Sequence, residues 1–75
     1  MNRFIFKRDN SKTKATYVPV SGNAKALLVC PDCGLRFSLD KHTVQENGDV
    51  HASVVCPNAD CKFHEWANLE GWVSA

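Results

Sequence analysis

The chain has 75 residues and a formal net charge of only +1 at pH 7, and 44% of it is hydrophobic, which is the composition of a folded domain and excludes a disordered tail. This length allows one compact domain and leaves little chain to wall off a reaction cavity, so we do not expect an enzyme. The sequence has no apolar run of the roughly 18 residues that cross a bilayer and no apolar leader core, and we expect a cytoplasmic protein without a membrane or small-molecule partner.

The first third of the chain is basic and contains two runs typical of strands. Residues 3–7 and 15–20 are rich in aromatic and β-branched side chains, and the polar stretch between them predicts a hairpin. Residues 1–29 carry six Lys and Arg against Asp9 alone, a net charge of +5. We therefore expect residues 1–24 to form a β-hairpin or a basic arm that contacts nucleic-acid phosphates. The candidate contacts are Arg3, Lys7, Arg8, Lys12 and Lys14, with Arg36 and Lys41 further along the chain.

Residues 25–55 contain three runs typical of strands. Residues 25–29 form a short run that is apolar apart from Lys25, and apolar residues alternate with polar ones over 35–39 and again over 50–54, as they do in half-buried strands. Asn47-Gly48 is the strongest turn signal in the sequence, because both residues tolerate positive φ. The pattern predicts an antiparallel hairpin around this turn.

Two cysteine pairs flank that hairpin and carry the clearest chemistry. Cys30 and Cys33 are separated by two residues, 22 residues follow, and Cys56 and Cys61 are separated by four. Short spacings let one turn supply two thiolates to the same ion, and Zn²⁺ takes four thiolates in a tetrahedron. The pairs also form a weak repeat, each with an apolar entry, a proline after the first cysteine and an Asp-Cys exit. The sequence therefore predicts one structural zinc ion.

Other uses of the cysteines fit less well. Two disulfides would require an oxidising compartment, and a redox Cys-x-x-Cys needs a βαβ context that this length does not hold. Four thiolates in a tetrahedron also bind iron, although such iron sites favour two cysteine pairs that are each separated by only two residues. His64 could replace one cysteine and open a coordination position, but four thiolates already complete the shell.

The C-terminal part has two alternatives for its structure and three for its tryptophans. The spacing of Trp66, Leu69 and Val73 suits a helix that Gly71 would end, whereas residues 63–66 suit a further strand. We expect Trp66 and Trp72 either to pack behind the zinc with Phe37 and Phe63, to anchor a partner protein or to stack on bases. The acidic neighbours Glu65 and Glu70 weaken the last alternative. Residues 30–75 have a net charge of −4, so an acidic ribbon could dock on a basic protein without touching nucleic acid.

The pattern Cys-x2-Cys-x22-Cys-x4-Cys, with Asn58 inside the second pair and an aromatic residue soon after it, resembles the zinc-finger motif of the Ogr/Delta family of phage transcription activators. The resemblance covers residues 30–66, about half of the chain. It implies that the four cysteines are metal ligands. It also implies DNA binding and contact with RNA polymerase.

Together these patterns predict a small, mainly β protein with one compact fold. We expect residues 25–75 to form a zinc ribbon of two cysteine knuckles and an antiparallel hairpin, preceded by the N-terminal β-hairpin or basic arm over residues 1–24. The predicted function is regulatory binding of nucleic acid, of the transcription machinery, or of both. The alternative is a protein-interaction module.

Overall fold

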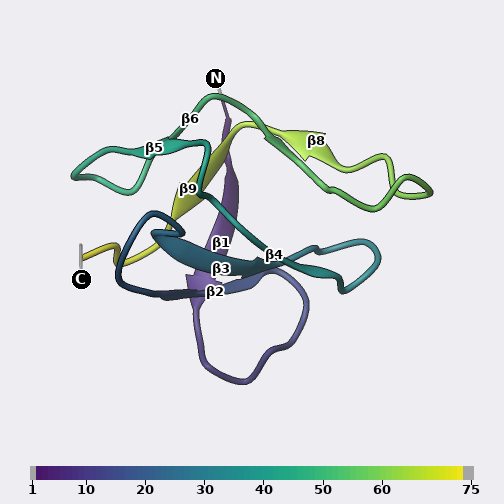
Figure 1. Ribbon diagram of the computed structural model, residues 1–75, viewed down its shortest axis with the longest axis horizontal. Coiled ribbons are helices and arrows are strands. Elements are labelled where there is room, and N and C mark those ends of the chain that lie inside the picture. Colours follow the sequence, from purple (N-terminus) through teal and green to yellow (C-terminus); the bar gives the residue numbers. More distant parts are fainter. Residues whose placement is uncertain (1, 74–75) are drawn as a thin grey trace.

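The protein is described by a computed structural model that covers residues 2–73 and folds into short β-strands (Figure 1). The strands of these residues are β1 (Phe4–Arg8), β2 (Thr16–Pro19), β3 (Ala26–Val29), β4 (Arg36–Ser38), β5 (Thr43–Val44), β6 (Val50–His51), β7 (Val54–Val55), β8 (His64–Glu65) and β9 (Ala67–Leu69). Five of them form one sheet in the order β4-β3-β2-β1-β9, while β5 pairs with β6 and β7 with β8. The expectation of a small, mainly β fold is confirmed.

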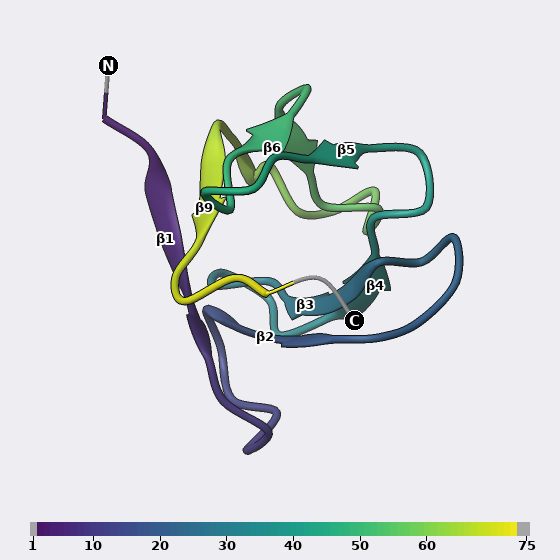
Figure 2. The ribbon, with the colours of Figure 1, turned by 90° about the vertical axis from the view of Figure 1, so that its left-hand side faces the viewer.

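The main sheet is strongly twisted. In Figure 2, β1 and β9 run upright, and β2, β3 and β4 run across beneath the β5–β6 hairpin. Strands β2 to β4 pair antiparallel, whereas β1 is parallel to both of its neighbours. The two small sheets therefore lie over one side of the large one, and the core fills the space between them.

The prediction of an N-terminal hairpin is wrong. β1 and β2 are parallel, with Lys7 opposite Thr16 and Arg8 opposite Tyr17. A hairpin turn reverses the chain, but residues 9–15 form a wider loop, hereafter the 9–15 loop, that returns the chain in its original direction. Lys12 and Ala15 help to close this loop with left-handed φ values of 64° and 66°. Residues other than glycine rarely adopt this backbone conformation, and sequence patterns do not reveal it.

The predicted turn at Asn47-Gly48 is confirmed. It joins β5 to β6, which pair antiparallel, and Gly48 has φ of +91°. Asn47 closes the turn by accepting a hydrogen bond on Oδ1 from the N–H of Asp49 at 3.0 Å. The hairpin is shorter than its pattern suggested, because the strand expected over residues 35–39 pairs with β3 instead.

The core joins the first strand to the last third of the chain. Phe6 is fully buried, and its ring meets those of Phe4 and Phe63 edge to face, with centroids 5.0 and 6.1 Å apart. Edge-to-face pairs add about 0.5–1.5 kcal/mol beyond the burial of their area. Other members of the buried cluster come from the large sheet and from both small sheets: Leu28, Leu39, Val50, Val54 and Leu69.

The C-terminal segment takes the strand alternative. Residues 63–69 form β8 and β9, and residues 2–73 contain no helix. β9 extends the main sheet by pairing with β1, and Gly71 follows in a turn with φ of +69°. No helix in the described residues is long and apolar enough to cross a membrane.

Candidate metal centre

The first cysteine pair occupies the turn between β3 and β4. The N–H of Cys30 donates to the carbonyl of Leu35 at 2.9 Å, and the N–H of Gly34 donates to the carbonyl of Cys30 at 3.0 Å. Gly34 has φ of +79°, which permits the tight return of the chain after Cys33. This turn brings both thiols to the same side of the knuckle.

The second pair lies in the corresponding turn between β7 and β8. The N–H of Cys56 donates to the carbonyl of Phe63 at 3.1 Å, as Cys30 does to Leu35 in the first knuckle. Two additional residues lengthen this turn, and Asn58 organises them. Its carbonyl accepts from the N–H of Cys61 at 2.9 Å, and its Oδ1 accepts from the N–H of Asp60 at 3.1 Å.

The four sulfur atoms meet between the knuckles. All lie within 4.8 Å of one another, and the Sγ–Sγ distance is 3.6 Å for both Cys30–Cys61 and Cys33–Cys56. A disulfide needs sulfurs about 2.05 Å apart, and these cysteines are free thiols. In a tetrahedron with bonds of about 2.3 Å, the sulfurs lie about 3.8 Å apart. The cluster thus has the dimensions that one tetrahedral metal ion needs.

Each sulfur also has a backbone donor two residues further along the chain. These N–H groups orient the ligands and stabilise negative charge on them, which is the usual role of groups that surround a thiolate centre. The donor–acceptor pairs are Asp32 with Cys30, Leu35 with Cys33, Asn58 with Cys56 and Phe63 with Cys61. The repeat in the sequence therefore corresponds to two knuckles with the same hydrogen bonding.

The thiols differ in how readily they lose a proton without metal. The hydrogen bond from the Leu35 backbone lowers the pKa of Cys33 to about 7, and the side chain of Asn58 contributes to this shift. Burial raises the pKa of Cys56 to about 12. The Phe63 backbone lowers the pKa of Cys61, but burial and the thiols of Cys30 and Cys33 outweigh it and the pKa is raised. An ion that enters the folded cluster must therefore displace protons from Cys56 and Cys61.

We expect mild acid to release the metal and the fold together. A coordinating thiol is deprotonated outright, whereas thiols of an unfolded chain take up protons below a pKa of about 8.5. The stability that the metal contributes is thus fully present above this pH and is lost as the pH falls. The free energy of unfolding decreases by at most about 5 kcal/mol per pH unit when all four thiols are protonated on unfolding. Thermal midpoints measured between about pH 8 and pH 5 test this. A midpoint that does not change over that range would contradict metal ligation.

His64 is not part of the sulfur cluster. Its Nε2 lies 2.7 Å from Oγ of Ser53, on the solvent side of the β7–β8 pair. The group in residues 2–73 that could hold a metal ion consists of the four cysteines alone. An ion held by four thiolates has no open position for water or substrate, so such a centre suits a structural ion better than hydrolysis.

Arg3 serves the fold rather than a partner. Its Nη1 donates to the carbonyls of Val50 and Ala67 at 3.2 and 3.0 Å, and its Nε lies 3.4 Å from Oδ1 of Asp49. The guanidinium also lies over the ring of Trp66, 5.7 Å from its centroid. These contacts tie the N-terminus to β6 and β9, and we therefore remove Arg3 from the candidate phosphate contacts.

The remaining basic candidates are exposed side chains on four parts of the chain. Lys7 and Arg8 end β1, Lys12 and Lys14 lie in the 9–15 loop, and Arg36 begins β4. Lys41 lies in the turn after β4.

One of these lysines connects the basic loop to the metal knuckle. A Cβ on Gly34 would lie 3.6 Å from Cε of Lys14, so the lysine stem passes over the first knuckle. The N–H of Ala15 donates to the carbonyl of Val29 at 3.0 Å, one residue before Cys30. The 9–15 loop therefore rests directly on the strand and turn that supply the first two thiols.

The tryptophans are only half-buried and both contact other side chains. Trp66 lies beneath Arg3 and beside His51, and Trp72 packs against Tyr17 with ring centroids 6.1 Å apart. Trp72 also borders the core cluster, as does Phe37, whereas Phe63 belongs to it. The expected aromatic core is therefore centred on the phenylalanines.

No family model, curated protein or solved structure matches the chain. The resemblance to the Ogr/Delta family consequently stays a prediction that rests on cysteine spacing. The function has to be inferred from the chemistry of the centre and of the surface around it.

Proposed function

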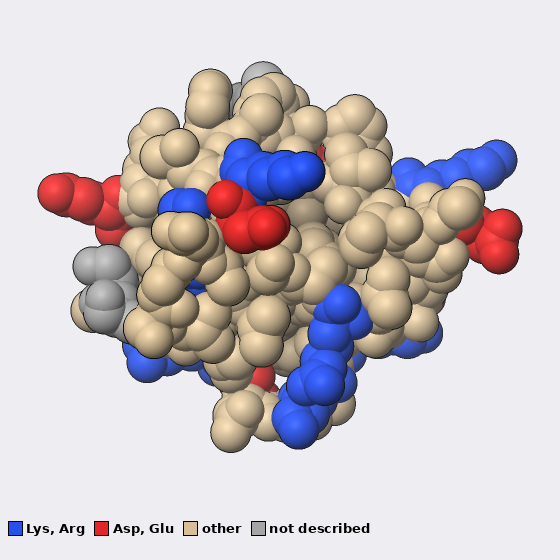
Figure 3. Space-filling model, in the orientation of Figure 1, with Lys and Arg blue, Asp and Glu red and all other residues tan. Residues whose placement is uncertain are grey.

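We propose that the protein is a structural zinc module that binds nucleic acid through a basic surface built on its first knuckle. The observation that carries this proposal is the position of the 9–15 loop, which brings Lys14 beside the thiolate knuckle and Lys12 near the exposed Arg36. Figure 3 shows Lys and Arg side chains projecting over the lower part of the molecule, where the loop lies. The basic surface comprises Lys12, Lys14 and Arg36, together with Lys7 and Arg8 at the end of β1, from which the loop begins.

The chemistry of the donors supports zinc. Four thiolates are soft ligands that suit zinc or iron, and zinc has no geometric preference that opposes a tetrahedron set by the protein. A Zn²⁺ ion with four thiolates carries a net charge of −2. Lys14 beside the first knuckle offsets part of this charge, so the metal would hold the loop and its cations in place.

The electrostatics of the basic surface suit phosphates. Cations held on a rigid loop and sheet neutralise backbone phosphates and release counterions, which is the main source of sequence-independent affinity. Six of the eight acidic residues lie on other elements, such as Glu46 in the β5–β6 turn, Asp60 on the second knuckle and Glu65 in β8, while Asp9 lies in the 9–15 loop and Asp32 in the first knuckle. The five cations of the basic surface outnumber these two carboxylates, which favours binding of a polyanion.

The protein-docking alternative has weaker support. It needs an exposed aromatic anchor, but Trp66 is covered by Arg3, and Trp72 packs against Tyr17. Acidic residues alone do not identify a partner. Nucleic-acid binding is therefore the function that the described residues support best.

A salt titration of charge-matched variants tests the proposed surface. We expect Lys12→Gln with Lys14→Gln to weaken binding to duplex DNA and to reduce the log–log salt slope by about 0.9 for each phosphate that the protein no longer neutralises. Lys25→Gln with Lys62→Gln removes the same charge outside the surface and should change the slope little. Fluorescence anisotropy on zinc-loaded protein measures both. Equal weakening by the two pairs would contradict this surface, and failure to bind both duplex DNA and a single-stranded oligonucleotide at low salt would overturn the function.

A further inference from the structure

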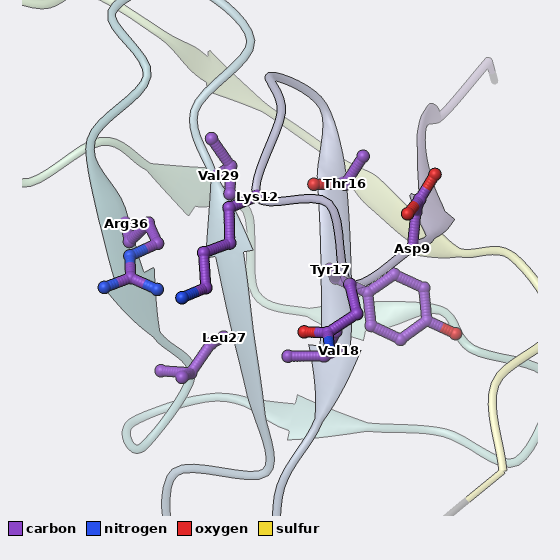
Figure 4. Close-up of a pocket in the computed structure, with 9 residues that line it drawn as sticks. Asp9, Lys12, Thr16, Tyr17, Val18, Leu27, Val29 and Arg36 are labelled. Carbon is purple, nitrogen blue, oxygen red and sulfur yellow. The ribbon is translucent and has the colours of Figure 1, made fainter.

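A small pocket opens on the sheet face beneath the 9–15 loop (Figure 4). Its volume is about 120 Å³, and its floor is formed by Val18, Leu27 and Val29. Val18 lies directly opposite Leu27 on β2 and β3, and Arg36 lies opposite Val29 on β4. Side chains of directly opposed residues share a face of a sheet, so three aliphatic side chains and one guanidinium belong to a single surface.

Two cations flank the mouth of the pocket, and hydrogen bonds brace the loop that carries one of them. In Figure 4 the side chains of Lys12 and Arg36 extend alongside the aliphatic floor. The loop that carries Lys12 is closed by a 2.9 Å hydrogen bond from the N–H of Ser11 to Oδ1 of Asp9. A second bond runs from Oγ1 of Thr16 to the carbonyl of Thr13. The pocket therefore combines an apolar floor with two cations, the carboxylate of Asp9 and the amide of Asn10.

We propose that this pocket takes one unstacked base of a single-stranded nucleic acid while Lys12 and Arg36 hold the adjoining phosphates. The proposal rests on the proposed function and specifies its substrate. An apolar cavity of about 150 Å³ encloses a benzene molecule, so this pocket of about 120 Å³, which is open to solvent on one side, can take part of one pyrimidine ring. Bases in a duplex are paired and stacked, whereas those of a single strand can be splayed onto a protein surface. Access to an unstacked base thus favours a single strand.

The test separates the base from its phosphates. We would measure anisotropy of a labelled 15-nucleotide oligo(dT) and of an abasic oligonucleotide of the same length, each with zinc-loaded full chain. Because the base would bury apolar surface against the aliphatic floor, we expect oligo(dT) to bind about tenfold more tightly. Val18→Phe fills the pocket without changing charge and should remove this preference. Val55→Phe is the matched control on a strand residue that is 53% exposed, and it should retain the preference.

The outcomes distinguish this inference from the function on which it depends. Leu27→Phe fills the same pocket from β3 and should repeat the result of Val18→Phe; zinc content and circular dichroism verify that each variant is folded. Equal binding of the two oligonucleotides, or a preference that both folded Phe variants keep, would overturn the base pocket and leave the phosphate surface intact. Failure of both oligonucleotides to bind at low salt would overturn the proposed function itself.

Discussion

Removing the metal should unfold the protein. Structural zinc contributes an apparent free energy of about 10–16 kcal/mol in small finger peptides, and the net stability of a typical domain is about 5–15 kcal/mol. Cys30 and Cys56 belong to the buried cluster, so metal loss would also leave charged or protonated sulfur inside the core. Because the thiolates connect the main sheet to the β7–β8 pair, these two parts would lose their strongest link.

Chelation followed by circular dichroism and proton NMR measures this effect. We expect a strong chelator to abolish dispersed amide signals, and one equivalent of added Zn²⁺ to restore them under reducing conditions. Cys56→Ser should reproduce the unfolding without a chelator, whereas Ser53→Ala, which changes a nearby residue outside the sulfur cluster, should not. A chelated protein that keeps its dispersed spectrum would contradict a structural metal.

Gly48→Ala should be among the most destabilising single substitutions in the chain. A Cβ on Gly48 would lie 2.3 Å from the carbonyl oxygen of Leu69 and 3.1 Å from Cβ of Trp72. The obstacle is backbone, and it is held because the N–H of Leu69 donates to the carbonyl of Gly48 at 2.8 Å. The φ of +91° adds left-handed strain of about 1–2 kcal/mol. We expect a total loss of about 3–5 kcal/mol, as for the larger effects in packed cores.

Gly22→Ala separates the clash of the added Cβ with the backbone from the strain of the left-handed φ. Gly22 has a similar φ of +84°, but nothing lies within 4 Å of its added Cβ, so only the strain of about 1–2 kcal/mol should appear. Chemical denaturation of zinc-loaded protein compares the two variants at equal metal content. If Gly48→Ala costs no more than Gly22→Ala, the β5–β6 turn does not pack on Leu69 as described.

The cysteine centre could be predicted because its signal is local. Ligand spacing, the proline after each first cysteine and the turn glycine at residue 34 all act within a few residues, and the same holds for the Asn47-Gly48 turn. The four sulfur atoms meet as the spacing predicted. Strand propensity in the first third also indicated the correct elements, although not how they pair.

The pairing of β1 and the floor of the pocket could not be predicted, because both depend on contacts between residues that are distant in the sequence. Arg3 looked like one more surface cation, but it bonds to carbonyls 47 and 64 positions away. The only signal for the pocket was that residues 17–20 and 26–29 are apolar at consecutive positions, which is typical of strands covered on both faces. That pattern indicates a covered sheet but does not reveal that a basic loop does the covering.

X-ray absorption at the zinc edge of purified protein tests the central claim most directly. We expect one zinc ion per chain with four sulfur neighbours at about 2.3 Å and no nitrogen or oxygen neighbours, because the four cysteines alone form the ligating group in residues 2–73. A first shell that contains nitrogen or oxygen, or protein whose cysteines are oxidised and metal-free, would contradict the structural four-thiolate centre on which the proposed surface and its pocket rest.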